Sequence, residues 1–600
     1  MNPPSVGLDV SWNGGLAMAI RDQLQWGTEI IFTYGPLGFL TGPTIWYQGS
    51  GLLNFAYHAA LFVGLCMTLV WALRRLVGPL PAFAIAFLIV TVLPVVEQSL
   101  VVAALLCMRA LEGERSERVL ISLVVGGATF AAIEVLIKLS AGPVIAAFFL
   151  IALIGLRARW WQVAAYLALL AAEMLVLWLL TGQSVGEIPD FLRNTSEIVS
   201  GFSEAMIASP DVAGWKVTVA TAIAVLVSIA LVVASARGNY RDERARWWGV
   251  GLTALAAFTV FKEGVVRTDA AHLSLFFSTA CILWIGLPWA KQRWQWMLAG
   301  VAVIVAIGWP VRPEGQVNYL DPVANVKQAF EQARNVLSPS RQRDLLASGR
   351  STMTSIYRLE PRTLGALRGH TVAIEPWEIG VAWAYDLEWQ PLPVFQNYSA
   401  YTSRLDRLNS EALESPKGPE RLLRENVGLV YPEFPTRGID NRFPGWDPPE
   451  QARAALCNFA VEHSTERWQV LARTPDRCGA SRPLGSAEAS PGEAVEVPTP
   501  GPREVVWARV EGVEVGGVER LLSFLGHARS RHAIVNGETS YRLVPGTAAD
   551  GLMLRAADGI DGEGAFAQVP QARTIAVTGT EGDVSFSFFA MPVRPPAGDG

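Results

Sequence analysis

A series of long apolar segments in the first half of the chain constrains its fold more than any other feature. A helix needs about 20 apolar residues to cross the hydrocarbon core of a bilayer. Several segments are short, and two pairs can form helical hairpins around Glu97 and around 140–143, so the count can change by one or two. About ten segments approach the required length: 52–73, 79–96, 99–111, 119–139, 141–156, 162–181, 215–235, 247–261, 271–289 and 296–309. The sequence predicts a polytopic α-helical membrane protein.

Basic residues cluster in alternate loops of this array, which predicts its orientation. The positive-inside rule assigns loops rich in arginine and lysine to the cytoplasm. The first 51 residues, residues 182–214, residues 262–269 and everything after Trp309 then lie on the extracytoplasmic side of an inner (plasma) membrane. The basic residues of the cytoplasmic loops are Arg74, Arg75, Arg109, Arg115, Arg118, Arg157, Arg159, Arg237, Arg241, Arg244, Arg246, Lys291 and Arg293.

This orientation places the N-terminus outside, with no targeting segment or span before Asp9 to carry it there. Either the next helix translocates the first loop, or a first span is missing because the start codon was placed too far downstream. We favour the second explanation, which raises the expected number of spans to eleven.

The second half of the chain has ordinary polar composition, although the whole chain is 51% hydrophobic. Residues 313–480 alternate strand-like segments (371–374, 393–395 and 428–431) with helical ones (326–346, 376–387 and 401–413), which is typical of an α/β layer structure. We expect five parts: an extracytoplasmic first loop with an interfacial helix (1–51), a transmembrane helical domain (52–312), an exported α/β domain (313–480), a Pro-, Gly-, Ser- and Glu-rich linker (481–502) and an exported β-sandwich (503–600).

Charge and motifs exclude several classes of partner. The net charge is −5 and the chain has no lysine- or arginine-rich run, so we expect no nucleic-acid partner. No glycine-rich phosphate loop follows a strand, and no cysteine or histidine group has metal-ligand spacing, so we expect no cofactor and no metal. Lipid and carbohydrate remain as partners.

The positions of the five cysteines agree with this division into apolar segments and an exported half. Cys66, Cys107 and Cys281 lie in apolar segments and are expected to act as small hydrophobic residues. The exported half contains only Cys457 and Cys478, which predicts one disulfide in an oxidising compartment. Its loop of about 20 residues would contribute about 3 kcal/mol by the chain-entropy relation.

Asp9 is the strongest catalytic candidate because it is a carboxylate in the first extracytoplasmic loop, beside the spans. A helix expected over 14–26, with Leu16, Ile20 and Leu24 on one stripe, would lie in the membrane interface before the turn at 34–36. Partial shielding there would raise the proton affinity of Asp9, as a general base requires. The alternative is that Asp9 caps the helix or pairs with an arginine.

A second charged cluster lies at the outer junction of two spans, in residues 261–272. Lys262, Arg267 and His272 are candidates to bind a phosphate group, with Lys138 as a fourth cation. Alternatives are ion pairs of Lys262 with Glu263 or Asp269, and of Lys138 with Glu134 one turn earlier. The residues that could support this site are Glu263, Asp269 and Tyr34.

The third extracytoplasmic loop contains an apolar helical stripe between Ile188 and Met206. It is expected to lie on the membrane or against the helical bundle. There it would either line an entry groove for a lipid or merely cover the bundle.

Multiple spans, an acidic first external loop with an interfacial helix, and a large exported C-terminal region resemble the C-type superfamily of membrane-embedded glycosyltransferases. The string Phe-Thr-Tyr-Gly-Pro-Leu-Gly-Phe at 32–39 also resembles one in bacterial multispan proteins of that kind. The resemblance covers the architecture of about the first 310 residues and, by motif, only Asp9. The chain departs from the superfamily in lacking a span before the acidic loop and in having one loop aspartate in place of an acidic pair.

The resemblance implies an inverting transfer of sugar from a polyprenyl-phosphate donor to an extracytoplasmic glycan or lipid acceptor. Asp9 would remove the acceptor proton, and the four cations would hold the leaving phosphate. The exported region would bind the acceptor through aromatic faces. An O-antigen ligase or polymerase is an alternative enzyme, and a lipid or solute transporter and a non-catalytic cell-envelope scaffold are alternatives of other classes. The aromatic candidates are Trp377, Trp383, Tyr385, Trp389, Tyr398 and Tyr401.

Overall fold

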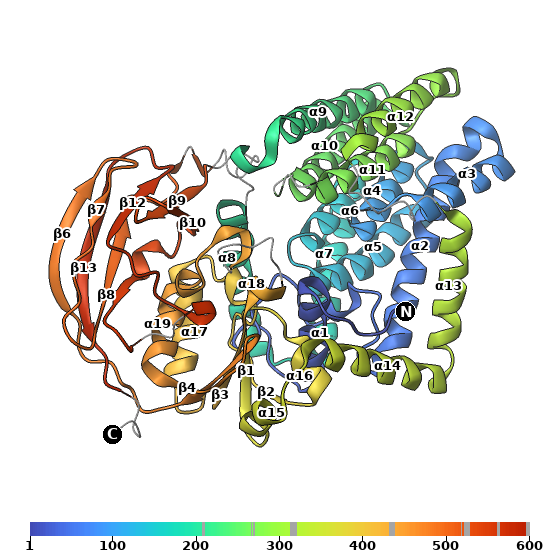
Figure 1. The fold of residues 1–600 in the computed structure, drawn as a ribbon. Coiled ribbons are helices and arrows are strands. Elements are labelled where there is room, and N and C mark those ends of the chain that lie inside the picture. The colour runs from blue at the N-terminus through green and yellow to red at the C-terminus, as the bar shows by residue number, and fades with distance from the viewer. Residues whose placement is uncertain are drawn as a thin grey trace. The chain divides into compact units, whose positions relative to one another are not determined.

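Two compact units make up the chain (Figure 1). The computed structural model describes residues 1–95, 97–206, 210–265, 267, 270–311, 321–430, 438–517, 519–520, 529–560 and 564–595. The helical unit comprises Met1–Pro3, Tyr34–Val185 and Ala208–Leu346, and the mixed unit comprises Pro4–Thr33, Gly186–Ile207 and Ala347–Gly600. Residues 4–33 and 186–207 thus belong to the same unit as the C-terminal region. The sequence instead predicts that residues 4–33 lie in a separate first loop and residues 186–207 in the transmembrane domain.

Capping residues explain several helix boundaries in the helical unit. Ser116 accepts a hydrogen bond from the backbone N–H of Val119 and so begins α5. Gly78, with φ of 85°, ends α2, and Pro79 directly begins α3. The helices are α2 (Gln48–Val77), α3 (Pro79–Val92), α4 (Gln98–Glu112), α5 (Glu117–Ile137), α6 (Gly142–Gly155), α7 (Trp160–Leu180), α9 (Pro210–Ala236), α10 (Glu243–Val265), α11 (Ala270–Gly286), α12 (Trp294–Gly308) and α13 (Pro322–Val336).

Among the described residues, four helical segments are long and apolar enough to cross a membrane, which suggests membrane association. The predicted number of about ten is not confirmed. A helix covers each predicted segment, but α4 and α12 have only 15 residues, about 22 Å at 1.5 Å per residue. The four segments are Gln48–Val77, Glu117–Ile137, Trp160–Leu180 and Thr218–Ala236, and the shorter apolar helices are Pro79–Val92, Gly142–Gly155 and Ala270–Gly286.

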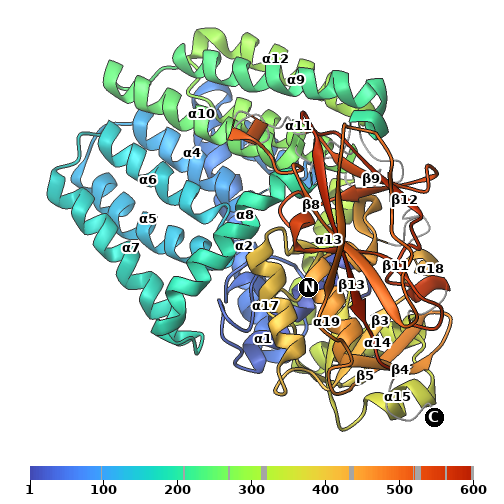
Figure 2. The same ribbon diagram turned by 90° about the vertical axis from the view of Figure 1, so that its left-hand side faces the viewer.

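Small residues bring the helices of this unit close together. A Cβ atom on Gly286 would lie 2.0 Å from Leu105, and one on Gly127 would lie 2.7 Å from Phe149. α5 lies between α6 and α7 (Figure 2). Only 11% of the apolar window of α7 is buried, so its outer side chains are exposed. Close backbone approach through small residues is typical of helices packed within a bilayer.

A five-stranded sheet forms the centre of the α/β part of the mixed unit. Its order is β2-β1-β3-β5-β4, with β1 parallel to β2 and β3, and with β5 antiparallel to β3 and β4. The strands are β1 (Thr371–Glu375), β2 (Glu388–Trp389), β3 (Arg421–Glu425), β4 (Phe459–Ser464) and β5 (Trp468–Arg473), and the helices are α1 (Leu8–Arg21), α8 (Ile188–Met206), α15 (Pro361–Leu367), α16 (Gly380–Tyr385), α17 (Ser403–Glu414), α18 (Val427–Val430) and α19 (Pro449–Asn458), with α14 (Pro339–Tyr357) between the units in sequence.

The predicted strand at 371–374 and the helices at 376–387 and 401–413 correspond to β1, α16 and α17. The other two predicted strands are wrong over the described residues: 393–395 has no strand, and 428–430 lies in α18, while Tyr431 lies outside them. On the side away from β2, β1 pairs with β3, which ends in Arg424 and Glu425. Both charged residues are buried in ion pairs. The sequence of β3 therefore lacks the apolar pattern by which a strand is recognised.

The C-terminal region is rich in strands and forms two antiparallel sheets of four, ordered β10-β9-β12-β7 and β11-β8-β13-β6. Side chains from both sheets share one core, including Ala533 and Ile575 from the first and Val506 and Phe586 from the second. The strands are β6 (Arg482–Ala489), β7 (Val495–Glu496), β8 (Glu504–Glu511), β9 (Arg531–Val535), β10 (Thr539–Leu543), β11 (Leu552–Ala556), β12 (Thr574–Thr578) and β13 (Val584–Pro592).

The segment expected to be a linker, 481–502, contains β6 and β7 instead. β6 pairs with β13 and β7 pairs with β12. Each is the last strand of its sheet. Edge strands tolerate the proline, glycine and charged residues that made this segment resemble a linker.

Helix α1 packs inside the mixed unit. The backbone N–H of Gly380 donates a hydrogen bond to Ser11 Oγ over 2.7 Å, and a Cβ atom on Gly15 would lie 3.0 Å from Phe395. The helix begins at Leu8, six residues before the expected start. Leu16 of its apolar stripe is fully buried and Ile20 and Leu24 are half-buried, whereas the sequence suggested a stripe in the membrane interface.

Helix α8 also belongs to the mixed unit. Ile198 and Met206 share a core with Trp377 and Tyr401, and Thr402 Oγ1 donates a hydrogen bond to Glu197 over 2.7 Å. Hence the apolar stripe of α8 is covered by the α/β part, whereas the sequence suggested the membrane or the helical bundle.

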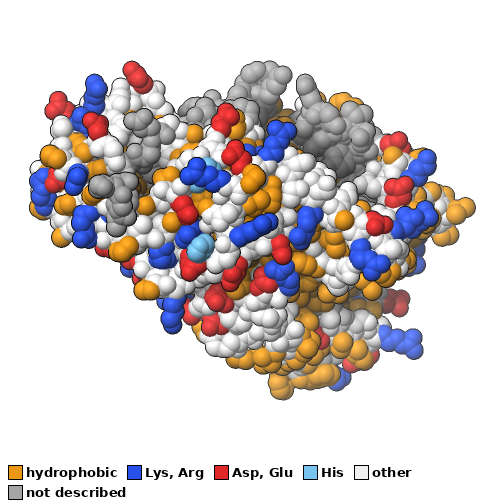
Figure 3. Space-filling model, turned by 60° about the horizontal axis from the view of Figure 1, so that its bottom comes forward, with side chains coloured by type: hydrophobic (Ala, Val, Ile, Leu, Met, Phe, Trp, Pro, Cys, Tyr) orange, Lys and Arg blue, Asp and Glu red, His pale blue; other side chains and the backbone are white. Residues whose placement is uncertain are grey.

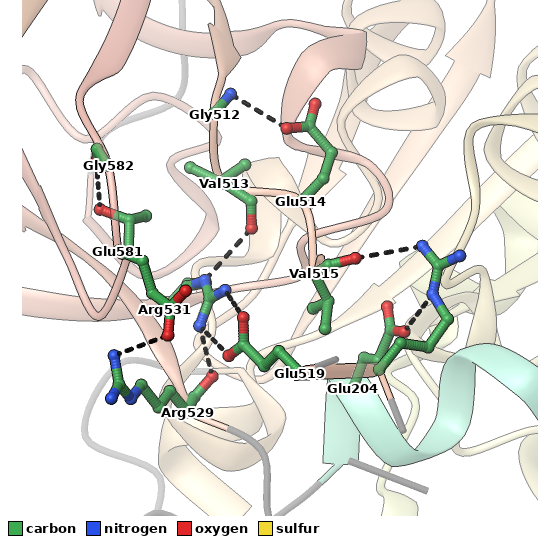
Figure 4. Close-up of polar contacts among 12 residues, drawn as sticks. Glu204, Gly512, Val513, Glu514, Val515, Glu519, Arg529, Arg531, Glu581 and Gly582 are labelled. Atoms are coloured by element: carbon green, nitrogen blue, oxygen red, sulfur yellow. Dashed lines mark hydrogen bonds and ion pairs between the residues drawn. The ribbon is translucent and has the colours of Figure 1, made fainter. Parts of the chain in front are cut away.

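The segment after β8 is held by ion pairs (Figure 4). The guanidinium of Arg531 contacts both carboxylate oxygens of Glu519 at 2.7 and 2.6 Å and donates to the carbonyl of Val513 over 3.2 Å. Arg520 contacts Glu204 of α8 over 3.2 Å. These contacts fasten α8 to the strand-rich region.

Candidate functional site

Three helix ends of the helical unit bring ionisable side chains together around Lys138. This residue ends α5, Glu97 precedes α4, and Glu263 lies in the last turn of α10. Lys138 Nζ forms ion pairs with Glu97 Oε1 and, at 3.3 Å, with Glu263 Oε1. It also lies 5.5 Å from the ring centroid of Tyr34. We call Glu97, Lys138 and Glu263 the lysine cluster.

Glu134 lies one turn before Lys138 but has other partners. Tyr57 of α2 donates a hydrogen bond to Glu134 Oε1 over 2.8 Å. The ion pairs that the structure gives for Lys138 in the described residues go to Glu97 and Glu263. The alternative of a Glu134–Lys138 pair is therefore wrong, because carboxylates from two other helices lie closer to the ammonium group.

The charge balance of the lysine cluster limits its chemistry. Two carboxylates surround one ammonium group, so the three groups carry a net negative charge when ionised. A phosphate would have to displace at least one carboxylate before it could contact Lys138. The cluster as it stands is better suited to a proton or a cation, and phosphate binding rests on the other predicted cations.

Those cations lie on both sides of Glu263 along the chain. Lys262 lies in the last turn of α10, His272 lies in the first turn of α11, and Arg267 lies between them, all half-buried. Asp269 lies outside the described residues.

Asp9 lies in the mixed unit, in the first turn of α1, and is exposed. The indole N–H of Trp12 donates a hydrogen bond to Asp9 Oδ1 over 3.1 Å. The expected shielding of this carboxylate from water is not found. Its position is nevertheless defined, because Trp12, one turn along the same helix, orients Asp9 Oδ1. The helix dipole also favours a negative charge in this first turn.

Cys457 of α19 and Cys478 form a disulfide with a Cα–Cα distance of 5.2 Å. It lies where the α/β part passes into the strand-rich region, since β6 begins at Arg482. Cys66, Cys107 and Cys281 are free and buried in helices.

A polar pocket in the mixed unit was missed by the sequence reasoning. It has a volume of about 60 Å³ and includes Glu375, Trp377, Asn397, Arg424 and Glu425 in its lining. Its residues come from separate segments between 375 and 568, and no local motif joins them. The one available signal was the pair of adjacent charges that ends β3.

Searches against protein-family models, curated proteins and solved structures find no match to this chain. The candidate sites therefore have to be interpreted from their own geometry.

Proposed function

We propose that the protein is an integral-membrane glycosyltransferase that moves a sugar from a polyprenyl-phosphate donor to an extracytoplasmic glycan or lipid acceptor. The observation that carries the proposal is the position of three cations, Lys262, Arg267 and His272, where the end of α10 is followed by the start of α11. Ionisable groups are rare among apolar helices because transfer to hydrocarbon is costly, and they commonly mark functional sites.

In this proposal the helical unit crosses the membrane about ten times. The basic loops lie in the cytoplasm, and the mixed unit lies outside. Exposed apolar side chains on α7 and the disulfide of the mixed unit support this arrangement, since disulfides persist in oxidising compartments.

The proposed reaction is a single displacement with inversion at the anomeric carbon. Asp9 removes the proton from an acceptor hydroxyl, the oxygen bonds to the anomeric carbon, and the bond from that carbon to the phosphate oxygen breaks. Lys262, Arg267 and His272 stabilise the charge on the departing polyprenyl phosphate. The exposure of Asp9 is consistent with access by an acceptor from water.

The test is transfer of labelled sugar from polyprenyl-phosphate donors in membranes matched for protein level. Asp9→Asn keeps the size of the side chain but cannot take up a proton, so transfer should fall by about 100-fold or more. Asp22→Asn is the matched control, because Asp22 lies at the other end of α1 and pairs with Arg21. Near-normal transfer by Asp9→Asn removes Asp9 as the base, and wild-type membranes that transfer no sugar refute the proposal.

A lipid or solute transporter is the second candidate, and the lysine cluster favours it. Carboxylates next to a lysine and a tyrosine, drawn from α2, α4, α5 and α10, resemble the proton relays of transporters. Potential-driven proton entry into proteoliposomes, lost in Lys138→Met, would support this candidate. If wild-type proteoliposomes take up protons no faster than protein-free vesicles, proton coupling is excluded.

A further inference from the structure

The polar pocket of the mixed unit lies at the carboxyl ends of two parallel strands. β1 and β3 pair in parallel, with Glu375 opposite Arg424, and the pocket lining includes both residues and continues into Trp377 and Val427 after the strands. Residues of the strand-rich region, among them Phe566, complete the wall. In sheets with parallel strands, ligands bind at this edge, because the loops that follow the strands meet there.

Arginine–carboxyl contacts surround the pocket. Arg424 contacts Glu375 at 2.7 Å, Arg467 contacts Glu425 at 2.7 Å, and Arg442 contacts Asp447 at 3.0 Å. A charged ligand would disturb these pairs in a poorly solvated site. These pairs therefore favour a neutral ligand.

Several polar groups of the lining lack a protein partner. Within the described residues, Asn397 Oδ1 and Glu425 Oε2 accept no hydrogen bond, although these residues are only 9% and 6% exposed. Arg424, which is 9% exposed, donates through Nε to Glu375, and neither of its Nη groups has a hydrogen-bond partner in the same part of the chain. Buried polar groups are normally satisfied, so acceptors and donors that share a pocket indicate a partner that both donates and accepts.

A hydroxyl group is such a partner, and the remaining walls suit the carbon skeleton that carries it. The lining includes Trp377 and Tyr398, whose ring centroids lie 6.0 Å apart at an interplanar angle of 82°. Pro376, Val427 and Phe566 add apolar surface. The combination of aromatic surface and unpaired polar groups matches the C–H faces and hydroxyl groups of a sugar.

We propose that this pocket is a binding site for a neutral sugar residue. At about 10–15 Å³ for each water-sized group, its volume of about 60 Å³ holds the hydroxyl-bearing edge of one ring. The remainder of a glycan would extend into solvent. Identification of this sugar as part of the acceptor rests on the proposed glycosyltransferase function, but binding itself does not require transfer.

Saturation-transfer NMR on the full-length protein in detergent tests the binding. The probes are glucose, galactose, mannose, arabinose and N-acetylglucosamine, each at about 10 mM, which detects millimolar dissociation constants. At least one should bind. If none of the five binds, the proposal is refuted.

Two variants locate the binding. Asn397→Ala removes an acceptor that has no protein partner, so the fold should be retained while affinity falls about 3- to 10-fold. Ala565→Trp should block the pocket, and Ala567→Trp is its matched control, two residues further along but outside the lining. Binding unchanged in Asn397→Ala and Ala565→Trp would overturn the proposal. Sugar binding without sugar transfer would refute only the proposed catalysis.

Discussion

Helix α7 of the helical unit and strand β13 of the mixed unit differ in whether their apolar side chains are exposed or buried. Along α7, Leu175, Val176 and Leu180 are exposed, and most of the apolar window of the helix is unburied. In the mixed unit, alternate residues of β13 such as Phe586 and Phe588 lie in the core. Figure 3 shows hydrophobic side chains gathered at the lower edge of that view and charged residues spread over much of the rest. The exposed apolar face of α7 suggests membrane association, whereas the apolar residues of β13 are buried within their own unit.

Buried charges show a second difference. In the mixed unit, Arg442 and Asp447 form a buried pair of one cation and one carboxylate, and the guanidinium also donates to the carbonyls of Tyr398 and Ala205. The helical unit instead places one lysine between two carboxylates. A buried pair of one cation and one carboxylate contributes to a defined fold. Where two carboxylates share one lysine, the lysine can exchange one carboxylate for the other.

The largest effect is expected from Arg442→Met. It leaves Asp447 buried without its partner and should lower the free energy of unfolding by about 3–5 kcal/mol. Thermal unfolding of the detergent-solubilised protein measures the loss, with the exposed Arg407→Met as control. Equal melting temperatures for the two variants would show that the Arg442 pair does not stabilise the mixed unit.

A matched pair of valines tests the contrast in exposed apolar surface. Val176 of α7 and Val461 of β4 are 54% and 55% exposed. Val176→Asp should cost about 2 kcal/mol in a bilayer, since Val176 lies away from the helix centre, whereas Val461→Asp should change stability by less than about 0.5 kcal/mol in water. Thermal stability in lipid nanodiscs is the measurement. Equal tolerance at both positions would remove the contrast between the two units.

A smaller effect is expected from pH. Burial and the neighbouring Glu378 carboxylate raise the pKa of Glu425 to about 8, although Arg467 opposes the shift. Between the usual pKa of 4.5 and about 8, the folded protein binds more protons at this site than the unfolded chain, so this contribution is full below pH 4.5 and is lost as pH rises toward 8. Melting temperatures should therefore decline less steeply with pH in Glu425→Gln than in the wild type. Parallel profiles would contradict the raised pKa.

The sequence predicts those elements whose pattern is local. The helices α5 and α7 are each 21 residues long and apolar, and β1 is a short segment that is buried continuously from Val372 to Glu375. Such elements carry their signal within one window of sequence. The count of spans was less certain, because a short apolar helix such as α4 has the same local composition as a full span.

The partners of amphipathic helices and the members of sites could not be predicted in the same way. The stripes on α1 and α8 show that one face of each helix is buried, but not that the α/β part covers it. Lys138 lies 41 residues from Glu97 and 125 from Glu263. The polar pocket draws on segments as distant as Glu375 and Gln568. These associations depend on tertiary structure, for which one sequence contains no local signal.

The most direct test of the contrast between the two units is the membrane topology of the intact chain. Alkaline phosphatase, which is active outside the cytoplasm, and green fluorescent protein, which folds inside, are fused after Trp309 and after Arg244. If the apolar helices span the membrane as proposed, the fusion after Trp309 has phosphatase activity and the fusion after Arg244 has fluorescence. The reverse pattern, or both positions on one side, would contradict the assignment of the helical unit to the bilayer and of the mixed unit to its outer face.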